Sequence, residues 1–213
     1  MSGAIVIAVL GAESTGKSTL AVALAQHIAA QTGLAAKHVD EHLRSWCERE
    51  GRTPRADEQR AIAQMQQERI AAAAATHDVV VADTTALMIA VYSDQVFGDT
   101  SLYADAEAAQ ARCAATLLTA LDLPWQSDGH QRDGPHVRDP VDAKVRAALE
   151  RAGTGYAVVS GVGPRRLAAA LAAVRRALSA PAPPGAAPRW QWHCERCGDP
   201  ACERHLLPHP PAR

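Results

Sequence analysis

A glycine-rich loop follows the first apolar run of the sequence and has the residue types of a phosphate-binding site. The segment GAESTGKS, residues 11–18, has the spacing Gly-x-x-x-x-Gly-Lys-Ser. In such a loop successive backbone N–H groups point inward, and glycine allows the chain to approach an anion closely. Lys17 is expected to reach the β- and γ-phosphates of ATP, and the Ser18 hydroxyl to bind Mg²⁺. The expected ATP-binding residues are Gly11, Ala12, Glu13, Ser14, Thr15, Gly16, Lys17, Ser18 and Thr19.

A second oxygen ligand for Mg²⁺ is expected at the end of a buried strand. Asp83 closes the run VVVAD and precedes two threonines. Ligands of open α/β sheets bind along the carboxyl edge of the strands, where Asp83 would lie. Asp83 is therefore a candidate metal ligand and catalytic residue. The alternative is that Asp83 only caps the helix that begins at Thr85.

The segment VDEHLR, residues 39–44, carries a second group of candidate residues. Asp40 and Glu41 lie where a strand gives way to a helix, and Arg44 follows Glu41 by one helical turn. A carboxylate here could accept the proton of a substrate hydroxyl or hydrogen-bond a ribose. The alternative is a helix start with a surface ion pair that contributes little stability.

A long polar segment, residues 121–140, has the composition of a lid that closes over a site. It contains Trp125 together with glycines and arginines. Arg132 or Arg138 could stabilise the charge of a transferring phosphoryl group, while closure excludes water. Trp125 could stack on a ring of the substrate, or it could be a core residue that anchors the loop.

The C-terminal end has the spacing of a small zinc site. Within residues 190–213 the spacing is Cys-x₂-Cys-x₄-Cys-x₂-His, and four such ligands would form a closed, structural tetrahedral site. The alternative is a tail with reduced cysteines. A tail of this kind could bind a partner protein. The candidate ligands are Cys194, Cys197, Cys202 and His205.

The elements that must position these residues alternate along the chain. We expect buried strands at 4–10, 36–40, 78–83, 115–121 and 156–161, and helices at 17–31, 56–76, 85–95, 102–113, 141–152 and 164–179. Continuous apolar strands separated by helices indicate a parallel sheet covered on both faces. The sequence thus predicts an α/β/α sandwich with a five-stranded parallel sheet in residues 1–178, a Pro/Ala linker at 179–189 and a Cys/His tail at 190–213.

Composition limits the kind of partner. The formal net charge is −1, which does not favour nucleic acid or a membrane surface as the main partner. The first apolar run is too short to span a membrane, and no basic segment precedes it. We therefore expect a cytoplasmic protein that binds ATP and a small second substrate.

Several segments together resemble the ribosylnicotinamide kinase domain of the NadR-type family. They are GAESTGKSTL, EHLR, IAQMQQER, VVVADTTALMIAVYSD and TLLTALDLPWQSDGHQRDG, and the resemblance covers residues 4–178. It implies a P-loop nucleoside kinase that transfers the γ-phosphate of ATP to the ribose 5′-hydroxyl of nicotinamide riboside. A kinase for another small metabolite, or a regulatory ATPase with a zinc-binding interaction tail, remains an alternative.

The resemblance also implies roles for particular residues. By motif, the substrate would contact Glu41, Arg44, Gln66, Trp125 and Asp128, and the turn SGVGPRR with Arg165 would lie near the adenine. The residues themselves add Asp40 as a substrate-binding candidate. Together with the residue chemistry above, the catalytic candidates are Lys17, Asp83, Glu41 and either Arg132 or Arg138. The chain departs from the family pattern at Ser45, where members often have a carboxylate, and in the spacing from Gly129 to Arg132.

Overall fold

The protein is described by a computed structural model that covers residues 3–126 and 135–179. Within these ranges five strands form one parallel sheet in the order β2-β3-β1-β4-β5. The strands are β1 (Ile5–Leu10), β2 (Ala36–Val39), β3 (Val79–Asp83), β4 (Ala115–Thr119) and β5 (Ala157–Val159). The five-stranded parallel sheet expected from the apolar runs is confirmed.

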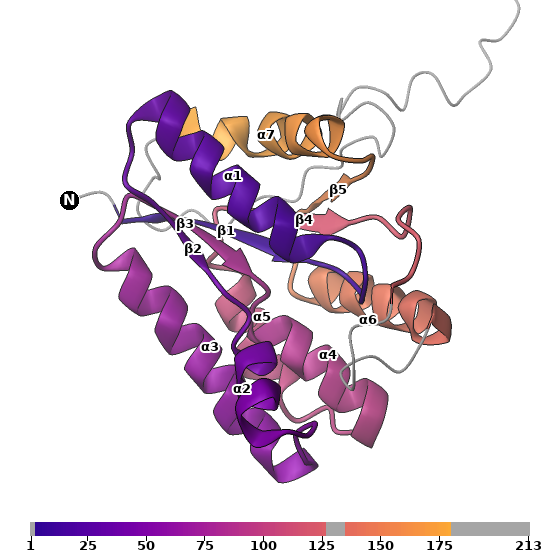
Figure 1. The fold of residues 1–213 in the computed structure, drawn as a ribbon. Helices are drawn as coiled ribbons and strands as arrows, with labels where there is room; N and C mark the ends of the chain where they lie inside the picture. The colour runs from indigo at the N-terminus through magenta and orange to yellow at the C-terminus, as the bar shows by residue number, and fades with distance from the viewer. Residues whose placement is uncertain (1–2, 127–134, 180–213) are drawn as a thin grey trace, which may run out of the picture.

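Helices cover both faces of the sheet (Figure 1). One face carries α1 (Lys17–Thr32) and α7 (Pro164–Ser179). The other carries α3 (Gln59–Ala74), α4 (Ala86–Phe97), α5 (Tyr103–Gln110) and α6 (Arg138–Arg151). A further helix, α2 (His42–Glu50), leaves the end of β2 and packs against α3, and short 3₁₀ turns occur at Ala56–Glu58 and Pro135–Val137. The three-layer α/β/α architecture is therefore confirmed.

The side chains of the central strand, β1, point alternately into two halves of the core, one on each face of the sheet. In β1, Ile7 and Val9 face α1 and α7, whereas Ala8 and Leu10 face the four-helix side, and all four are fully buried. Side chains of a strand point alternately to opposite faces, so an apolar residue at every position is what a sheet covered on both sides requires. The strand that leads into the phosphate-binding loop is thus anchored from both sides.

Some element boundaries differ from those expected. The helix expected at 56–76 begins with a 3₁₀ turn and becomes α-helical only from Gln59 to Ala74. The helix expected at 141–152 begins earlier, at Arg138, because a proline is tolerated in the first turn of a helix and Pro140 does not end it. The predicted linker after Ser179 and the Cys/His tail lie outside the described residues, as do Asp128 and Arg132.

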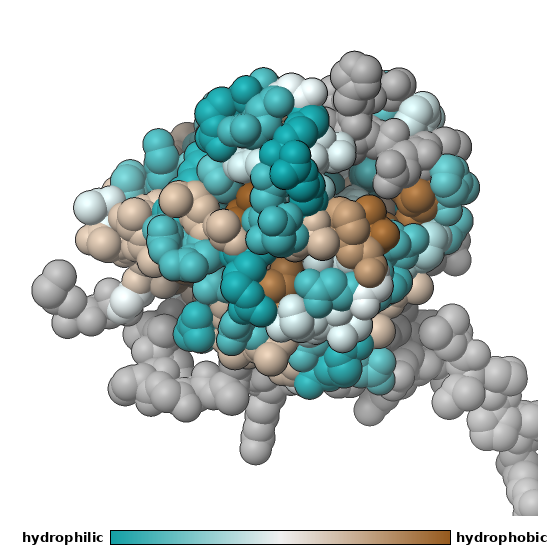
Figure 2. Space-filling model, turned by 90° about the horizontal axis from the view of Figure 1, so that it is seen from below, coloured by the Kyte–Doolittle hydropathy of each residue, from teal (hydrophilic) through white to brown (hydrophobic). Residues whose placement is uncertain are grey.

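The surface below the sheet is mixed in character. Figure 2 shows hydrophobic residues in small areas between hydrophilic ones on this face. None of the helices in the described ranges combines the length and the hydropathy that a transmembrane span needs.

Candidate functional site

The loop between β1 and α1 has the backbone conformation that its glycines predict. Gly11, Ser14 and Gly16 have φ angles of 146°, 54° and 74°, in the region that favours glycine. A Cβ atom added to Gly11 would clash with Thr119 Oγ1, so no larger residue fits there without displacing the Thr119 side chain. The loop therefore lies directly on the end of β4.

Hydrogen bonds hold the loop in this conformation. Thr15 Oγ1 donates to the carbonyl oxygen of Ala12 at 2.8 Å, and Thr119 Oγ1 lies 2.7 Å from Thr15 Oγ1 and 3.1 Å from the Leu10 carbonyl oxygen. Lys17 Nζ donates to the Ala12 carbonyl at 2.9 Å, which keeps its ammonium group over the loop. Thr15 and Thr119 are fully buried, so these bonds are shielded from water. Thr119 was not predicted as a site residue; its only signal is a hydroxyl at the end of an otherwise apolar strand.

A buried arginine connects the loop to the turn after β5. Arg166 Nη2 donates to the Thr15 carbonyl at 2.8 Å, and its Nη1 donates to the Gly161 carbonyl at 2.7 Å and to Asp122 Oδ1 at 2.8 Å. Burial raises the pKa of Asp122, but the hydrogen bonds from Arg166 and the Gly161 N–H outweigh it and lower that pKa. Arg165, which was predicted to contact ATP, is exposed. The contact of Arg165 with ATP stays a prediction, and Arg166, which was not predicted as a site residue, is the arginine that contacts the loop.

Asp83 lies at the carboxyl end of β3, next to the phosphate-binding loop. It pairs in register with Val9 of β1 and is 3% exposed. Its Oδ1 atom is buried and has no hydrogen-bond partner among the described residues. The cap of α4 is Thr85, whose side chain accepts a hydrogen bond from the Leu87 N–H at 3.3 Å. The alternative that Asp83 only caps this helix is therefore wrong.

The donor set at this edge suits magnesium. Ser18 offers a hydroxyl and Asp83 a carboxylate oxygen that no group in the described ranges satisfies, and hard oxygen ligands are those that Mg²⁺ takes. Within the described ranges no group of three or more His, Cys, Asp or Glu side chains is arranged to hold a metal. Mg²⁺ in phosphate-transfer sites does not need such a group, because phosphates and water supply most of its ligands.

Glu41 and Asp40 are adjacent in sequence but differ in environment. Glu41 is partly buried, lies at the start of α2 and pairs with Arg44 at 3.7 Å. Asp40 is 72% exposed and pairs with His38 at 3.2 Å and Arg69 at 3.9 Å. Of the two carboxylates, only Glu41 lines the cavity described below.

Gln66 is hydrogen-bonded to the backbone around Asp40 and Glu41. It is fully buried in α3, and its Oε1 accepts a hydrogen bond from the His42 N–H at 2.7 Å. Its Nε2 lies 3.4 Å from the carbonyl oxygens of Asp40 and Thr84. The Gln66 side chain has no exposed surface, and both ends of its amide are bonded to backbone atoms. It therefore holds the start of α2 and the end of β3 in place. The structure gives Gln66 a positioning role, and its predicted direct contact with a substrate stays a prediction.

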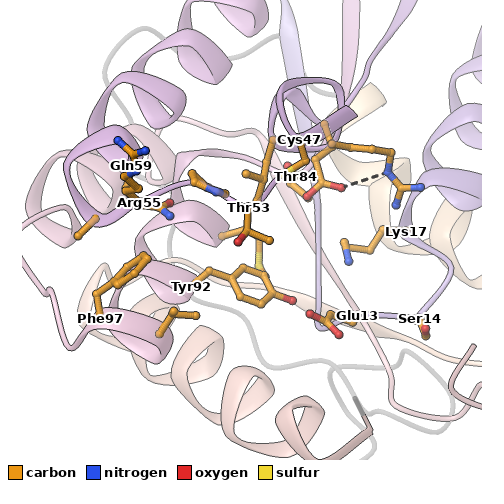
Figure 3. Close-up of a pocket in the computed structure, with 17 residues that line it drawn as sticks. Glu13, Ser14, Lys17, Cys47, Thr53, Arg55, Gln59, Thr84, Tyr92 and Phe97 are labelled. Atoms are coloured by element: carbon orange, nitrogen blue, oxygen red, sulfur yellow. Dashed lines mark ion pairs between the residues drawn. The ribbon is translucent and has the colours of Figure 1, made fainter. Parts of the chain in front are cut away.

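A cavity of about 410 Å³ opens from the phosphate-binding loop and extends between α2, α3 and α4. Figure 3 shows Lys17 and Ser14 at one end, with Gln59 and Phe97 at the other. The Tyr92 hydroxyl points toward the carboxylate of Glu13. The lining residues are Glu13, Ser14, Lys17, Glu41, Leu43, Arg44, Cys47, Thr53, Pro54, Arg55, Ala56, Gln59, Thr84, Met88, Tyr92, Val96 and Phe97.

Most of the far half of this cavity was not predicted. Met88, Tyr92 and Val96 are spaced by four on α4, and Leu43 and Cys47 are spaced by four on α2, so each set shares one helix face. That spacing is the only sequence signal, and it is the same for a face that packs in the core. Burial raises the pKa of the Cys47 thiol, and Glu41 raises it further.

The described part of the predicted lid is fastened to the phosphate-binding loop. The Ser14 hydroxyl donates to the Gln126 carbonyl at 2.7 Å and accepts from the Gln126 N–H at 3.1 Å. Trp125 is half-buried, its Nε1 has no partner among the described residues, and it does not line the cavity. The structure therefore does not bring Trp125 to the cavity.

Arg138 lies beneath the lid segment. It is 8% exposed, and its Nη1 donates to the Leu123 carbonyl at 2.9 Å. It does not line the cavity either. Its Nε and Nη2 atoms are buried and have no partner among the described residues, and its role as a catalytic lid arginine stays a prediction. The other candidate, Arg132, lies outside the described residues.

The sequence matches the AAA domain family AAA_28 over residues 6–166. The match spans the loop, the sheet and Arg166, and the chain belongs to this family. No curated protein matches the chain in sequence.

Two solved structures share the fold at low sequence identity. A NadR protein in complex with NR has a TM-score of 0.68 at 18% identity, covering 86% of this chain and 53% of that chain. A thymidylate kinase from Ehrlichia chaffeensis has a TM-score of 0.57 at 14% identity, covering 82% of this chain and 98% of that chain. The chain thus spans about half the length of the NadR chain. The fold is that of the P-loop kinases, and the predicted resemblance to NadR is confirmed at the level of the fold.

Proposed function

We propose that this protein is an ATP-dependent kinase for a small molecule and that its acceptor is the ribose 5′-hydroxyl of nicotinamide riboside. The observation that carries the proposal is the cavity, which has a volume of about 410 Å³. It begins at Lys17 and Ser14 and extends away from the phosphate-binding loop. Cavities of this size hold small molecules. An ATPase without a second substrate would not need an enclosed space on this side of the loop.

The phosphate-binding loop would hold the phosphates of ATP. Its backbone N–H groups and the N-terminal end of α1 would face the phosphates, and the Lys17 ammonium would move from the Ala12 carbonyl to the β- and γ-phosphate oxygens. Ser18 and Asp83 would hold Mg²⁺, which neutralises charge on the phosphate oxygens when it is bound. Arg166 would keep the loop aligned with the turn on which the adenine is expected to lie.

Glu41 is the carboxylate best suited to orient the acceptor hydroxyl. It lines the cavity near Lys17, whereas Asp40 is 72% exposed and Asp83 is buried behind the loop. The acceptor oxygen would attack the γ-phosphorus, the bond to the β–γ bridging oxygen would break, and the hydroxyl proton would pass to Glu41. Little charge develops on the attacking oxygen in a loose transition state, so Glu41 need not be a strong base.

The likeness to a NadR protein in complex with NR supports nicotinamide riboside as the acceptor. The motifs EHLR and DLPWQSDG support the same assignment. The likeness to a thymidylate kinase supports a second candidate, in which the acceptor is another nucleoside or a nucleotide. Arg132, in the lid segment, would stabilise the transferring phosphoryl group in either case.

ADP release separates these possibilities. Purified protein is incubated with Mg·ATP alone, with nicotinamide riboside, and with a panel that contains thymidine, adenosine and thymidine monophosphate. The proposal requires ADP release that depends on nicotinamide riboside. Release that depends on another acceptor would favour the second candidate, and release that no acceptor changes would favour a regulatory ATPase.

The C-terminal residues 190–213 are proposed to form a separate zinc-binding tail that contacts a partner protein. The spacing of Cys194, Cys197, Cys202 and His205 supports this proposal. Metal analysis of the purified protein and of Cys197→Ser tests it. The proposal predicts about one zinc ion per chain that the substitution removes, and equal zinc contents would contradict it.

A further inference from the structure

The cavity ends, away from the phosphate-binding loop, at a buried amide side chain. Gln59 is the first residue of α3, is 4% exposed and lines the cavity. Figure 3 shows Gln59 and Arg55 at the end of the cavity opposite Lys17. A molecule that fills the cavity from the loop outward would therefore bring its distal end to Gln59.

The side-chain carbonyl of Gln59 lacks a hydrogen-bond partner. Its Oε1 atom is buried and unpaired among the described residues. Buried polar groups are nearly always paired, because an unpaired acceptor has lost its water without replacement. Gln66, two turns further along the same helix, is fully buried and has bonds at both ends of its amide. The unpaired state is thus specific to the glutamine that lines the cavity.

The surroundings of Gln59 suit a flat ring with one polar substituent. Phe97 lies at the same end of the cavity (Figure 3), and Met88 and Val96 contribute further apolar surface to the cavity. Rotation of the Gln59 amide by 180° exchanges its oxygen and nitrogen, so the amide can present either an acceptor or a donor. A carboxamide on the ring can pair with both groups.

We infer that Gln59 is a specificity-determining residue that hydrogen-bonds a neutral carboxamide or amine on the ring of the acceptor nucleoside. The inference rests on the proposed function, in which the ribose hydroxyl lies at the loop and the ring at the far end. Arg55, which is exposed at the same end, is the group that a ring carboxylate would select instead. Two acceptors that differ only in this substituent therefore distinguish the two residues.

The experiment compares nicotinamide riboside with nicotinic acid riboside, which carries a carboxylate in place of the carboxamide. Wild type, Gln59→Met and the control Gln64→Met are measured for turnover with ATP and for riboside binding by calorimetry in the presence of a non-hydrolysable ATP analogue. Gln64 lies on the same helix, is exposed and pairs with Glu68 at 2.9 Å, so its substitution leaves the cavity unchanged.

We expect wild type to bind and phosphorylate the carboxamide with a kcat/KM about tenfold or more above that of the acid. Gln59→Met should lose this preference through a weaker affinity for the carboxamide, with the KM for ATP unchanged. Without a bound ligand, Gln59→Met should have a Tm equal to or above that of wild type, because the substitution removes an unpaired buried acceptor. Gln64→Met should behave as wild type.

The other results separate the inference from a structural role of Gln59 and from the proposed kinase reaction. A preference of wild type for the acid would assign the ring substituent to Arg55. A lower Tm together with a raised KM for ATP in Gln59→Met would show a structural role. Binding of the carboxamide that depends on Gln59, without turnover, would support the inference and contradict the proposed kinase reaction. Absence of binding of either riboside would contradict both.

Discussion

The Nη2 atom of Arg166 donates a hydrogen bond to the carbonyl oxygen of Thr15 at 2.8 Å, although the two residues are 151 positions apart. The same guanidinium also bonds the Gly161 carbonyl and Asp122. The phosphate-binding loop is therefore joined to the ends of β4 and β5 by a single buried side chain. The geometry of the loop depends on the C-terminal part of the sheet as well as on its own glycines.

Substitution of Arg166 by Gln should weaken ATP binding. The loop loses a charge-assisted hydrogen bond, which is worth about 1.5–3 kcal/mol, so the KM or Kd for ATP should rise about tenfold or more. Fluorescent-nucleotide binding measures this without any acceptor. Arg175→Gln is the matched control, because Arg175 is an exposed arginine on the same helix, α7. Equal effects of the two substitutions would contradict the role of Arg166.

Substitution of Asp122 by Asn should change the dependence of stability on acid. The pKa of Asp122 is lowered in the folded protein, where the bonds from Arg166 and the Gly161 N–H outweigh burial. A lowered folded-state pKa stabilises the protein above the ordinary aspartate pKa of 3.8, and this contribution is lost as the pH falls through the lower folded-state value.

Thermal unfolding of Asp122→Asn at pH 7 and at acid pH checks this prediction. At pH 7 we expect a Tm about 2–4 °C below wild type, as for a partly exposed pair worth roughly 1 kcal/mol. The difference should shrink as the pH falls below the ordinary aspartate range. A constant difference at all pH values would assign the effect to something other than the charge of Asp122.

Substitution of Glu41 by Gln should lower turnover more than binding. If Glu41 receives the proton of the acceptor hydroxyl, kcat should fall about tenfold to a hundredfold while the KM for ATP stays near that of wild type. Steady-state kinetics with nicotinamide riboside measures both constants. Asp40→Asn is the control, because Asp40 is the neighbouring carboxylate and is 72% exposed. A larger loss in Asp40→Asn than in Glu41→Gln would reverse the assignment.

The sheet and the loop could be predicted because their signals are local. A strand buried on both faces is a continuous apolar run, as in β3, and the loop is defined by residues only seven positions apart, Gly11 and Ser18. The position of Asp83 beside the loop could also be predicted, because parallel strands present their carboxyl ends at one edge of the sheet. These inferences required no knowledge of how the helices pack.

The far half of the cavity could not be predicted for the opposite reason. Gln59, Met88 and Tyr92 come together only because β3 lies between β2 and β1, which brings α2, α3 and α4 to one end of the sheet. The contact of Arg166 with the loop could not be predicted either, because consecutive residues of an α-helix point about 100° apart. Only the packing of α7 determines which arginine faces the loop.

The most direct test of the account is to measure ADP and nicotinamide mononucleotide together in one reaction. Wild-type protein with Mg·ATP and nicotinamide riboside should form the two products in equal amounts, and Lys17→Ala, which removes the ammonium group over the loop, should form neither at a comparable rate. ADP formed without the mononucleotide, at a rate that nicotinamide riboside does not change, would contradict the assignment of this protein as a nicotinamide riboside kinase.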